Sequence, residues 1–284
     1  MDDVQPVENR SGNAQPATSP PIYFIGCDMG SWHKKEKKNG DALAVCKWDG
    51  RKLSHVDEWN GQMFYPAKGV LAGTISKATQ QEAKIIIAVD GALAWPASFA
   101  DLVAAAPSAS HLPTFSLNGA INNPYLYRET ERFIKVAMAM DAPLTAPGDR
   151  FGNNSSKAQA LVAWFKSQLN SLYRPPFDRW CSTRAAQAQY TLIEVYPKAS
   201  MKCDAFRALE WPKPTQSMAA VGNSDIADAK RCAMTGVCYA ARLGMLGQAR
   251  ITFPDIWLPG DQYNGITYNC ALLQQEGWIF CPKR

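Results

Sequence analysis

Apolar stretches of strand length alternate with polar turns in the first part of the chain. The stretches 22–30, 41–48 and 51–59 are rich in aliphatic and aromatic residues, and Asp49-Gly50 is a turn signal between the second and the third. Connections with such turn signals join antiparallel neighbours. This part of the chain therefore predicts three antiparallel strands in a meander.

The pattern changes to a helical period after Pro66. Residues of the buried face recur there three and four positions apart, namely Val70, Leu71, Thr74, Ile75 and Ala78. A run of β-branched residues follows at 85–89. A strand that comes after a helix is most easily laid parallel to the first strand of the sheet, so we expect an α/β fold with a mixed sheet flanked by helices.

Helical patterns dominate about 91–190, which we interpret as an insertion between the central and the late strands. The favoured helices are 96–106, 127–140 and 155–169. A late β-rich run at 190–197 closes on Pro197, and a last long helix at 223–245 has Ser224 as its cap. The tail contains EGWIFCP, which favours a short docking strand.

Acidic residues lie within or at the ends of several predicted strands, although strands usually avoid such residues. Asp28 ends the first strand, Asp90 ends the strand at 85–89, and Glu194 lies inside the late strand. Asp225 and Asp228 are three residues apart near the start of the last helix, and so they share one face. An isolated buried carboxylate costs several kcal/mol, roughly, so these acids need a cation, hydrogen bonds or protonation.

A divalent cation meets this need for several acids at once. Oxygen ligands alone are typical of Mg²⁺ or Mn²⁺, and ligands gather where parallel strands end. We therefore predict a metal site formed by Asp28, Asp90, Asp228 and Glu194, with Asp225 as a further catalytic candidate. Carboxylate-bound Mg²⁺ or Mn²⁺ favours the hydrolysis of phosphodiesters.

Each acid also has a purely structural interpretation. Asp28 and Asp90 could instead be strand-end caps or Asx turns, since Asp before Gly is a common turn element. Acids in the first turn complement the helix dipole, which applies to Asp225 and Asp228. Glu194 could instead form a structural salt bridge.

Six short motifs, taken in order, resemble a family of predicted ribonuclease H-like nucleases that is catalogued as a domain of unknown function. They cover nearly everything after the leader: IGCDMG (25–30), IAVDGALAWP (87–96), YRETERF (127–133), EVYP (194–197), DIADAKRCAMTG (225–236) and EGWIF (276–280). The resemblance implies a ribonuclease H-like fold and metal-dependent cleavage of nucleic acid. It also implies Asp28 as the first-strand ligand, Asp90 as the acid of the adjacent strand, and Asp228 or Asp225 as the acid of the last helix.

Two groups of cations are candidates for contact with a nucleic-acid backbone. The loop after the first strand carries four of them, Lys34, Lys35, Lys37 and Lys38, which otherwise form a solvated turn. Arg128 is a candidate phosphate contact, or else a local ion pair with Glu131 three residues later. The net charge of +5 tolerates a polyanionic partner without requiring one.

The remaining composition sets limits on the class of protein. Residues 1–20 are rich in Pro, Ser, Asn and Gln, so we expect a disordered leader there and a single domain over 21–284. No run has the apolar length of a membrane span, and none of the eight cysteines forms a Cys-x-x-Cys pair, so we expect a cytoplasmic protein without a membrane partner or a zinc site.

Two other functions fit the same pattern. One is a ribonuclease H-like module that binds nucleic acid or a protein without cutting. The other takes residues 28–31, Asp-Met-Gly-Ser, as the phosphate loop of an actin-like or sugar-kinase-like ATPase. That fold usually needs two copies of the domain, and the chain has no second Asp-x-Gly-Ser loop.

Overall fold

The computed structural model describes most of the chain after the leader. The described residues are 20–30, 41–61, 69–105, 123–140, 147, 149–247, 249, 251–264 and 269–284. The predicted leader, except for residue 20, and the four lysines of the loop after the first strand lie outside them.

A mixed sheet forms the centre of the described structure, with the strand order β3-β2-β1-β4-β6-β5 and with β9 also paired to β6. Its strands are β1 (Ile22–Asp28), β2 (Asp41–Trp48), β3 (Leu53–Gly61), β4 (Lys84–Asp90), β5 (Leu172–Tyr173), β6 (Tyr190–Val195) and β9 (Ile279–Phe280). The first three strands pair antiparallel, while β4 runs parallel to β1 and β6 runs parallel to β4, β5 and β9. The predicted α/β fold with a mixed sheet is confirmed, and so is the docking strand in the tail.

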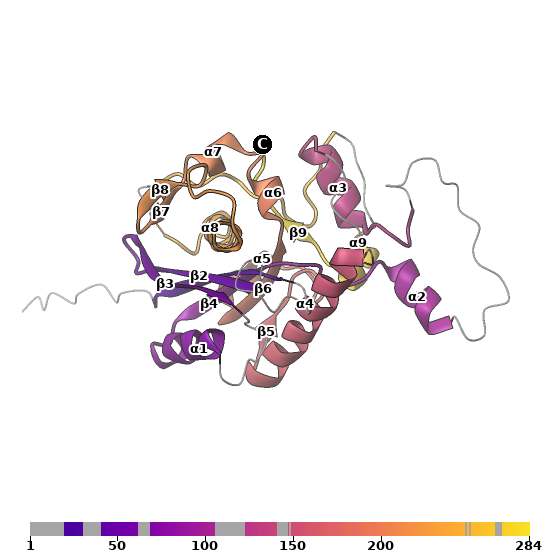
Figure 1. The fold of residues 1–284 in the computed structure, drawn as a ribbon, viewed down its shortest axis with the longest axis horizontal. Helices are drawn as coiled ribbons and strands as arrows, with labels where there is room; N and C mark the ends of the chain where they lie inside the picture. The colour runs from indigo at the N-terminus through magenta and orange to yellow at the C-terminus, as the bar shows by residue number, and fades with distance from the viewer. Residues whose placement is uncertain are drawn as a thin grey trace, which may run out of the picture.

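Helices cover both faces of this sheet, with α8 on one face and α1 and α4 on the other (Figure 1). The helices are α1 (Val70–Gln80), α2 (Ala97–Ala105), α3 (Glu129–Ala137), α4 (Asp149–Gln168), α5 (Ser182–Gln187), α6 (Pro197–Ser200), α7 (Asp204–Arg207), α8 (Asp225–Arg242) and α9 (Cys270–Glu276). A separate hairpin of β7 (Glu210–Pro212) and β8 (Thr215–Ser217) lies on the α8 side. No helix in the described part of the chain combines the length and the apolar character needed to cross a membrane.

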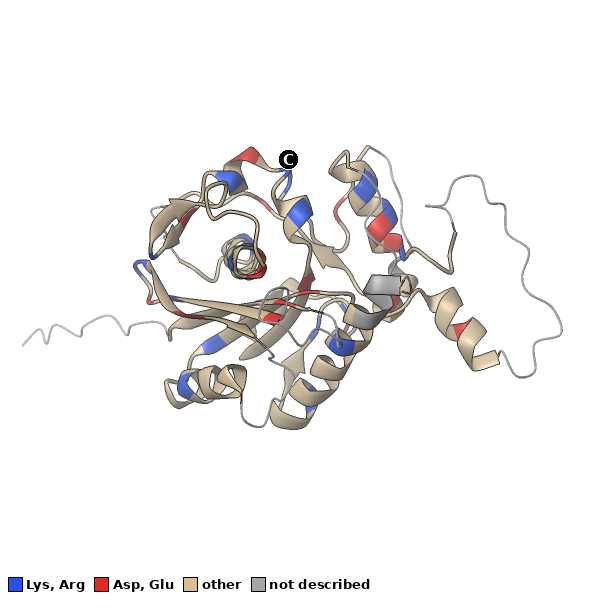
Figure 2. Cartoon of the chain, in the orientation of Figure 1, with Lys and Arg blue, Asp and Glu red and all other residues tan. Residues whose placement is uncertain are grey.

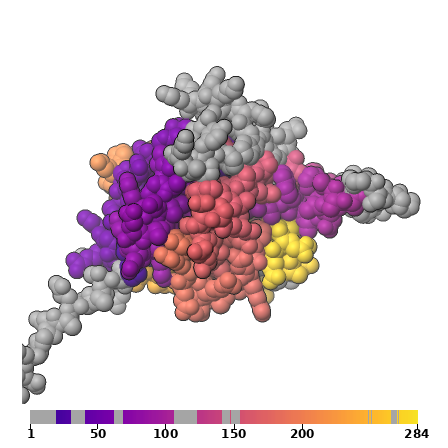
Figure 3. Space-filling view, turned by 90° about the horizontal axis from the view of Figure 1, so that it is seen from below, coloured from indigo at the N-terminus to yellow at the C-terminus, as the bar shows by residue number. Residues whose placement is uncertain are grey.

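Alternating side chains of the central strands build two separate cores. Phe24 and Ile86 pack with α8 in one cluster. Ile25 and Ile87 pack with α1 and α4 in the other, and the space-filling view from below shows that side of the molecule (Figure 3). Strands buried on both faces read as almost continuous apolar runs, which explains why the sequence identified them clearly.

The helix α4 begins six residues earlier than the predicted start at 155. Gly152 and Asn153 are poor helix formers, so local propensity favours the later start. The buried side chains of Ala158 and Phe165 pack against the sheet, and this tertiary packing stabilises the whole helix.

A close approach between α8 and β1 depends on Gly26. A Cβ atom at this position would lie 1.9 Å from the carbonyl oxygen of Ala229 and 2.4 Å from the backbone nitrogen of Ala233. Only glycine leaves room for the helix backbone at this distance. Because Gly26 lies two residues before Asp28, this contact brings the start of α8 towards the end of β1.

Candidate functional site

Asp28 and Asp90 end two neighbouring parallel strands at the same level of the sheet. They are direct partners in the register of β1 and β4, and Val195 of β6 is level with Asp90. Partners in register point to the same face, and Asp28 shares its face with Gly26, which contacts α8. Both carboxylates are partly exposed and lie on the α8 side of the sheet.

The first turn of α8 supplies two further carboxylates. Ser224 caps this helix as expected, since its side chain accepts a hydrogen bond of 3.2 Å from the backbone nitrogen of Ala227. Asp225 and Asp228 follow directly, and both are partly exposed. The charge of Asp228 acts on both Asp28 and Asp90, so the structure brings these residues of three separate elements together.

The mutual proximity of these acids changes their protonation. Burial, followed by the charges of Asp90, Asp228, Asp225 and Asp41, raises the pKa of Asp28 well above its ordinary value. Burial, followed by Asp228 and Glu194, does the same to the pKa of Asp90. Carboxylates that repel one another in this way are stabilised by any cation placed between them.

Two residues that the sequence pattern did not single out lie beside the acids. Burial and the charges of Asp90 and Asp228 raise the pKa of Tyr196 to about 12, so its phenol is a neutral hydrogen-bond donor next to the carboxylates. Arg231 lies one helical turn after Asp228 and donates to its Oδ1 atom over 2.7 Å. The spacing of Asp228 and Arg231, three residues apart on a helix, was visible in the sequence, whereas the position of Tyr196 depends on the fold.

Glu194 does not belong to this cluster, which corrects its predicted role as a metal ligand and catalytic acid. It is level with Val89 and one residue before Val195, so its side chain points to the opposite face from Asp90. Both of its carboxylate oxygens accept hydrogen bonds from Arg128, and Oε2 also accepts one from the backbone of Leu93 over 3.0 Å. The structural salt bridge is therefore the correct interpretation.

Arg128 is likewise internal, and the predicted phosphate contact is wrong. Its side chain is 1% exposed and lies between Glu131 and Glu194. Its Nη1 atom also donates to the backbone oxygen of Glu276 over 2.8 Å. The opposite charges of these two glutamates raise the pKa of Arg128 further, although burial acts against them, so a permanently charged guanidinium is held inside the protein.

A second buried ion pair lies next to Asp28 and was missed in the sequence. Asp41, at the start of β2, accepts hydrogen bonds from Lys157 of α4, with 2.7 Å between Nζ and Oδ2. Its Oδ1 atom also accepts the backbone N–H of Gly30 over 2.9 Å. The only sequence signal was an acid at the start of an otherwise apolar strand.

The described residues contain no three His, Cys, Asp or Glu side chains that are already close enough together to hold a metal ion. The chemistry of the cluster still fits a hard divalent cation, because all of its carboxylate donors are oxygen atoms. Figure 2 marks acidic positions on the central strands and on α8. An ion there would have to draw Asp28, Asp90 and Asp228 closer to one another.

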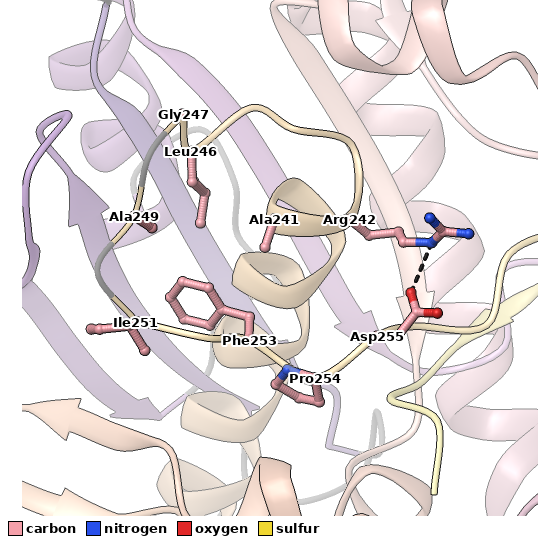
Figure 4. A pocket seen from close by; sticks show the side chains of 9 residues that line it. All are labelled: Ala241, Arg242, Leu246, Gly247, Ala249, Ile251, Phe253, Pro254 and Asp255. Atoms are coloured by element: carbon pink, nitrogen blue, oxygen red, sulfur yellow. Dashed lines mark ion pairs between the residues drawn. The ribbon is translucent and has the colours of Figure 1, made fainter.

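A pocket of about 370 Å³ lies at the opposite end of α8. Figure 4 shows Phe253 and Leu246 among its lining residues, with an ion pair of 2.8 Å between Arg242 and Asp255 at one side. Arg242 follows Asp228 by fourteen residues of helix, which corresponds to about 21 Å at 1.5 Å per residue. This pocket is therefore separate from the carboxylates.

Comparisons with known protein families, with curated proteins and with solved structures each found no match for this chain.

Proposed function

We propose that the protein is a metal-dependent nuclease that hydrolyses phosphodiester bonds of nucleic acid. One observation carries this proposal: Asp28 and Asp90 are level on adjacent parallel strands, and the charge of Asp228 on α8 raises the pKa of both. A cluster of carboxylates with strongly perturbed pKa values is more typical of a functional site than of a structural one. No lysine or arginine of the described residues forms an ion pair with Asp28 or Asp90.

The topology supports the finer proposal of a ribonuclease H-like fold. Three antiparallel strands are followed by a helix and a parallel strand, and a late parallel strand precedes a long helix. This is the connectivity that the resemblance of the six motifs implies. The motif residues Asp28, Asp90 and Asp228 are also the ones that lie near one another.

Each residue of the site would have a separate role in the reaction. Asp28, Asp90 and Asp228 would hold Mg²⁺ or Mn²⁺, with Asp225 beside them. Such an ion supplies a nucleophilic water at neutral pH and neutralises the phosphate. Arg231 fixes the orientation of Asp228 through its hydrogen bond to Oδ1, and the neutral phenol of Tyr196 would donate a hydrogen bond to an oxygen of the substrate.

The substitution Asp28→Asn tests this function. We expect wild-type protein to bind Mn²⁺ in isothermal titration calorimetry and to cleave nucleic acid only when Mn²⁺ or Mg²⁺ is present. Asp28→Asn should lose both properties, because it removes the charge that a cation needs. Asp204→Asn is a matched control, since the side chain of Asp204 is 93% exposed and pairs with Arg207. Cleavage that persists in Asp28→Asn would refute the proposal.

A module that binds without cutting is the second candidate. It is favoured by the lack of any preformed group of three metal ligands among the described residues. Under this alternative, wild-type protein binds nucleic acid equally well with and without divalent cations, and calorimetry detects no carboxylate-dependent Mn²⁺ site.

A further inference from the structure

We propose that two buried ion pairs, Asp41 with Lys157 and Glu194 with Arg128, are clamps that position the two strand-end aspartates of the site. Each clamp acts by holding the turn that follows one aspartate. This inference rests on the proposed function, since it assigns positioning residues to the same carboxylate site. None of the four clamp residues belongs to the cluster itself.

The first clamp holds the turn after β1. The backbone N–H of Gly30, two residues after Asp28, donates to Oδ1 of Asp41 over 2.9 Å. Lys157 binds both carboxylate oxygens of Asp41, and both side chains are at most 6% exposed. A neutralised carboxylate that is fixed in this way gives the backbone of Gly30 one defined position.

The second clamp repeats this arrangement after β4. The backbone N–H of Leu93, three residues after Asp90, donates to Oε2 of Glu194 over 3.0 Å. Arg128 donates to both oxygens of Glu194 from its two terminal nitrogens, and both side chains are at most 4% exposed. Such a two-point contact fixes the carboxylate in orientation as well as in position.

The two clamps occupy equivalent places in the sheet. Asp41 lies on β2 and Glu194 on β6, the outer neighbours of β1 and β4. Glu194 points away from the α8 face, and so does Asp41, which pairs with α4 on the opposite side. Each central aspartate thus has a carboxylate on the flanking strand that anchors its following turn from the far side of the sheet.

A contact from α4 joins the two turns. A Cβ atom on Gly91, the residue after Asp90, would lie 3.1 Å from the Cβ of Ala158 and 3.5 Å from the side chain of Met29. Ala158 is the residue after Lys157. The same turn of α4 therefore lies beside the residue after Asp90 through Ala158 and holds the turn after Asp28 through Lys157 and Asp41, so a displacement of α4 would reach both turns.

Stability alone does not explain these pairs. A buried ion pair replaced as a whole by apolar residues is often neutral or stabilising, while removal of one partner is strongly destabilising. The informative variants therefore change both partners of a clamp. The pair Asp41→Asn with Lys157→Met keeps an acceptor for Gly30, whereas Asp41→Leu with Lys157→Met removes it.

Calorimetry with Mn²⁺ distinguishes the two double variants. We expect the Asn variant to bind Mn²⁺ within a few-fold of the wild-type affinity, and the Leu variant to bind it about 10-fold to 100-fold more weakly, the usual loss when a group that orients a ligand is removed. Circular dichroism and thermal unfolding must show that both variants are folded. Equal Mn²⁺ affinities in two folded double variants would overturn the clamp.

Amide hydrogen exchange measured by NMR gives a readout that needs no metal. The amide of Gly30 should be protected in wild-type protein and in the Asn variant, and should exchange faster in the Leu variant. If wild-type protein binds no Mn²⁺, the proposed function fails, while the exchange of Gly30 still tests the clamp. Unchanged protection of Gly30 in the Leu variant would refute the clamp whatever the metal does.

Discussion

Two pairs of carboxylates lie near the same end of the central strands but have opposite surroundings. Asp28 and Asp90 point to the α8 face and are partly exposed. Burial and the charges of neighbouring acids raise the pKa of both. Asp41 and Glu194 point to the other face, are buried, and each binds a cationic side chain. Carboxylates on one face of the sheet therefore bind a cationic side chain, whereas Asp28 and Asp90 on the other face are repelled by neighbouring acids.

This difference indicates which acids serve the fold and which serve a function. A protein gains nothing in stability from two adjacent carboxylates that repel each other, so their presence favours a functional role. A carboxylate that is fully engaged by an arginine or a lysine has no capacity left for a substrate. The presence or absence of a cationic partner thus distinguishes the two roles, although all four acids lie at or next to a strand end.

The largest effect should come from removing the cation of a buried ion pair. In Arg128→Met, Glu131 and Glu194 remain buried without their cation, so we expect the free energy of unfolding to fall by about 3–5 kcal/mol. Urea denaturation monitored by circular dichroism at pH 7.5 measures this loss.

Arg132→Met is the matched control on the same helix. Arg132 pairs with Glu129 over 3.3 Å, and the two side chains are 29% and 18% exposed. We expect a loss of at most about 1 kcal/mol, because a partly solvated pair contributes little. Similar losses in both variants would show that the network around Arg128 has no special weight.

A smaller effect should follow from moving α8 away from β1. Gly26→Ala places a Cβ atom against the backbone of α8, which must move away from β1. We expect a loss of about 1–3 kcal/mol in stability, the range for an overpacked core, and a weaker Mn²⁺ site because Asp228 moves with the helix. Gly73→Ala on α1 is the control, since a Cβ atom there meets nothing within 4 Å. Unchanged stability and Mn²⁺ affinity in Gly26→Ala would mean that α8 does not depend on this contact.

The smallest effect is expected on the face of α8, in the pH dependence of stability. The pKa of Asp28 is raised in the folded protein, so the folded state binds more protons than the unfolded state, and stability falls as pH rises from the unfolded pKa through the folded one. Without metal, Asp28→Asn should therefore be more stable than wild type at pH 7.5, because the amide removes a charge that burial and the neighbouring acids disfavour. The gain should vanish towards pH 4.

Asp41→Asn is the contrast on the other face: it should lose stability strongly at pH 7.5, because it leaves the buried ammonium of Lys157 without its carboxylate. Urea denaturation in EDTA at both pH values measures the two variants side by side. A loss of stability in Asp28→Asn at pH 7.5 would contradict the raised pKa of Asp28.

The sequence by itself determined the mixed sheet and most of its elements. Strands buried on both faces leave continuous apolar runs, and a helix leaves a regular period with a cap such as Ser224, so both are visible locally. The positions of Asp28 and Asp90 at strand ends were visible for the same reason. Bounds such as Asp41–Trp48 for β2 matched the expectation because a turn signal marks the end of the strand.

Only the tertiary structure decided which acids share a face and which have partners. Side chains alternate along a strand, so a shift of one residue in register separates Glu194 from Asp90, and no local pattern encodes the register of parallel strands far apart in the chain. The pairing of Asp41 with Lys157 joins residues 116 positions apart, and it forms because α4 packs on the face of the sheet opposite α8. Partners at such separations are fixed by the packing of whole elements and not by neighbouring residues.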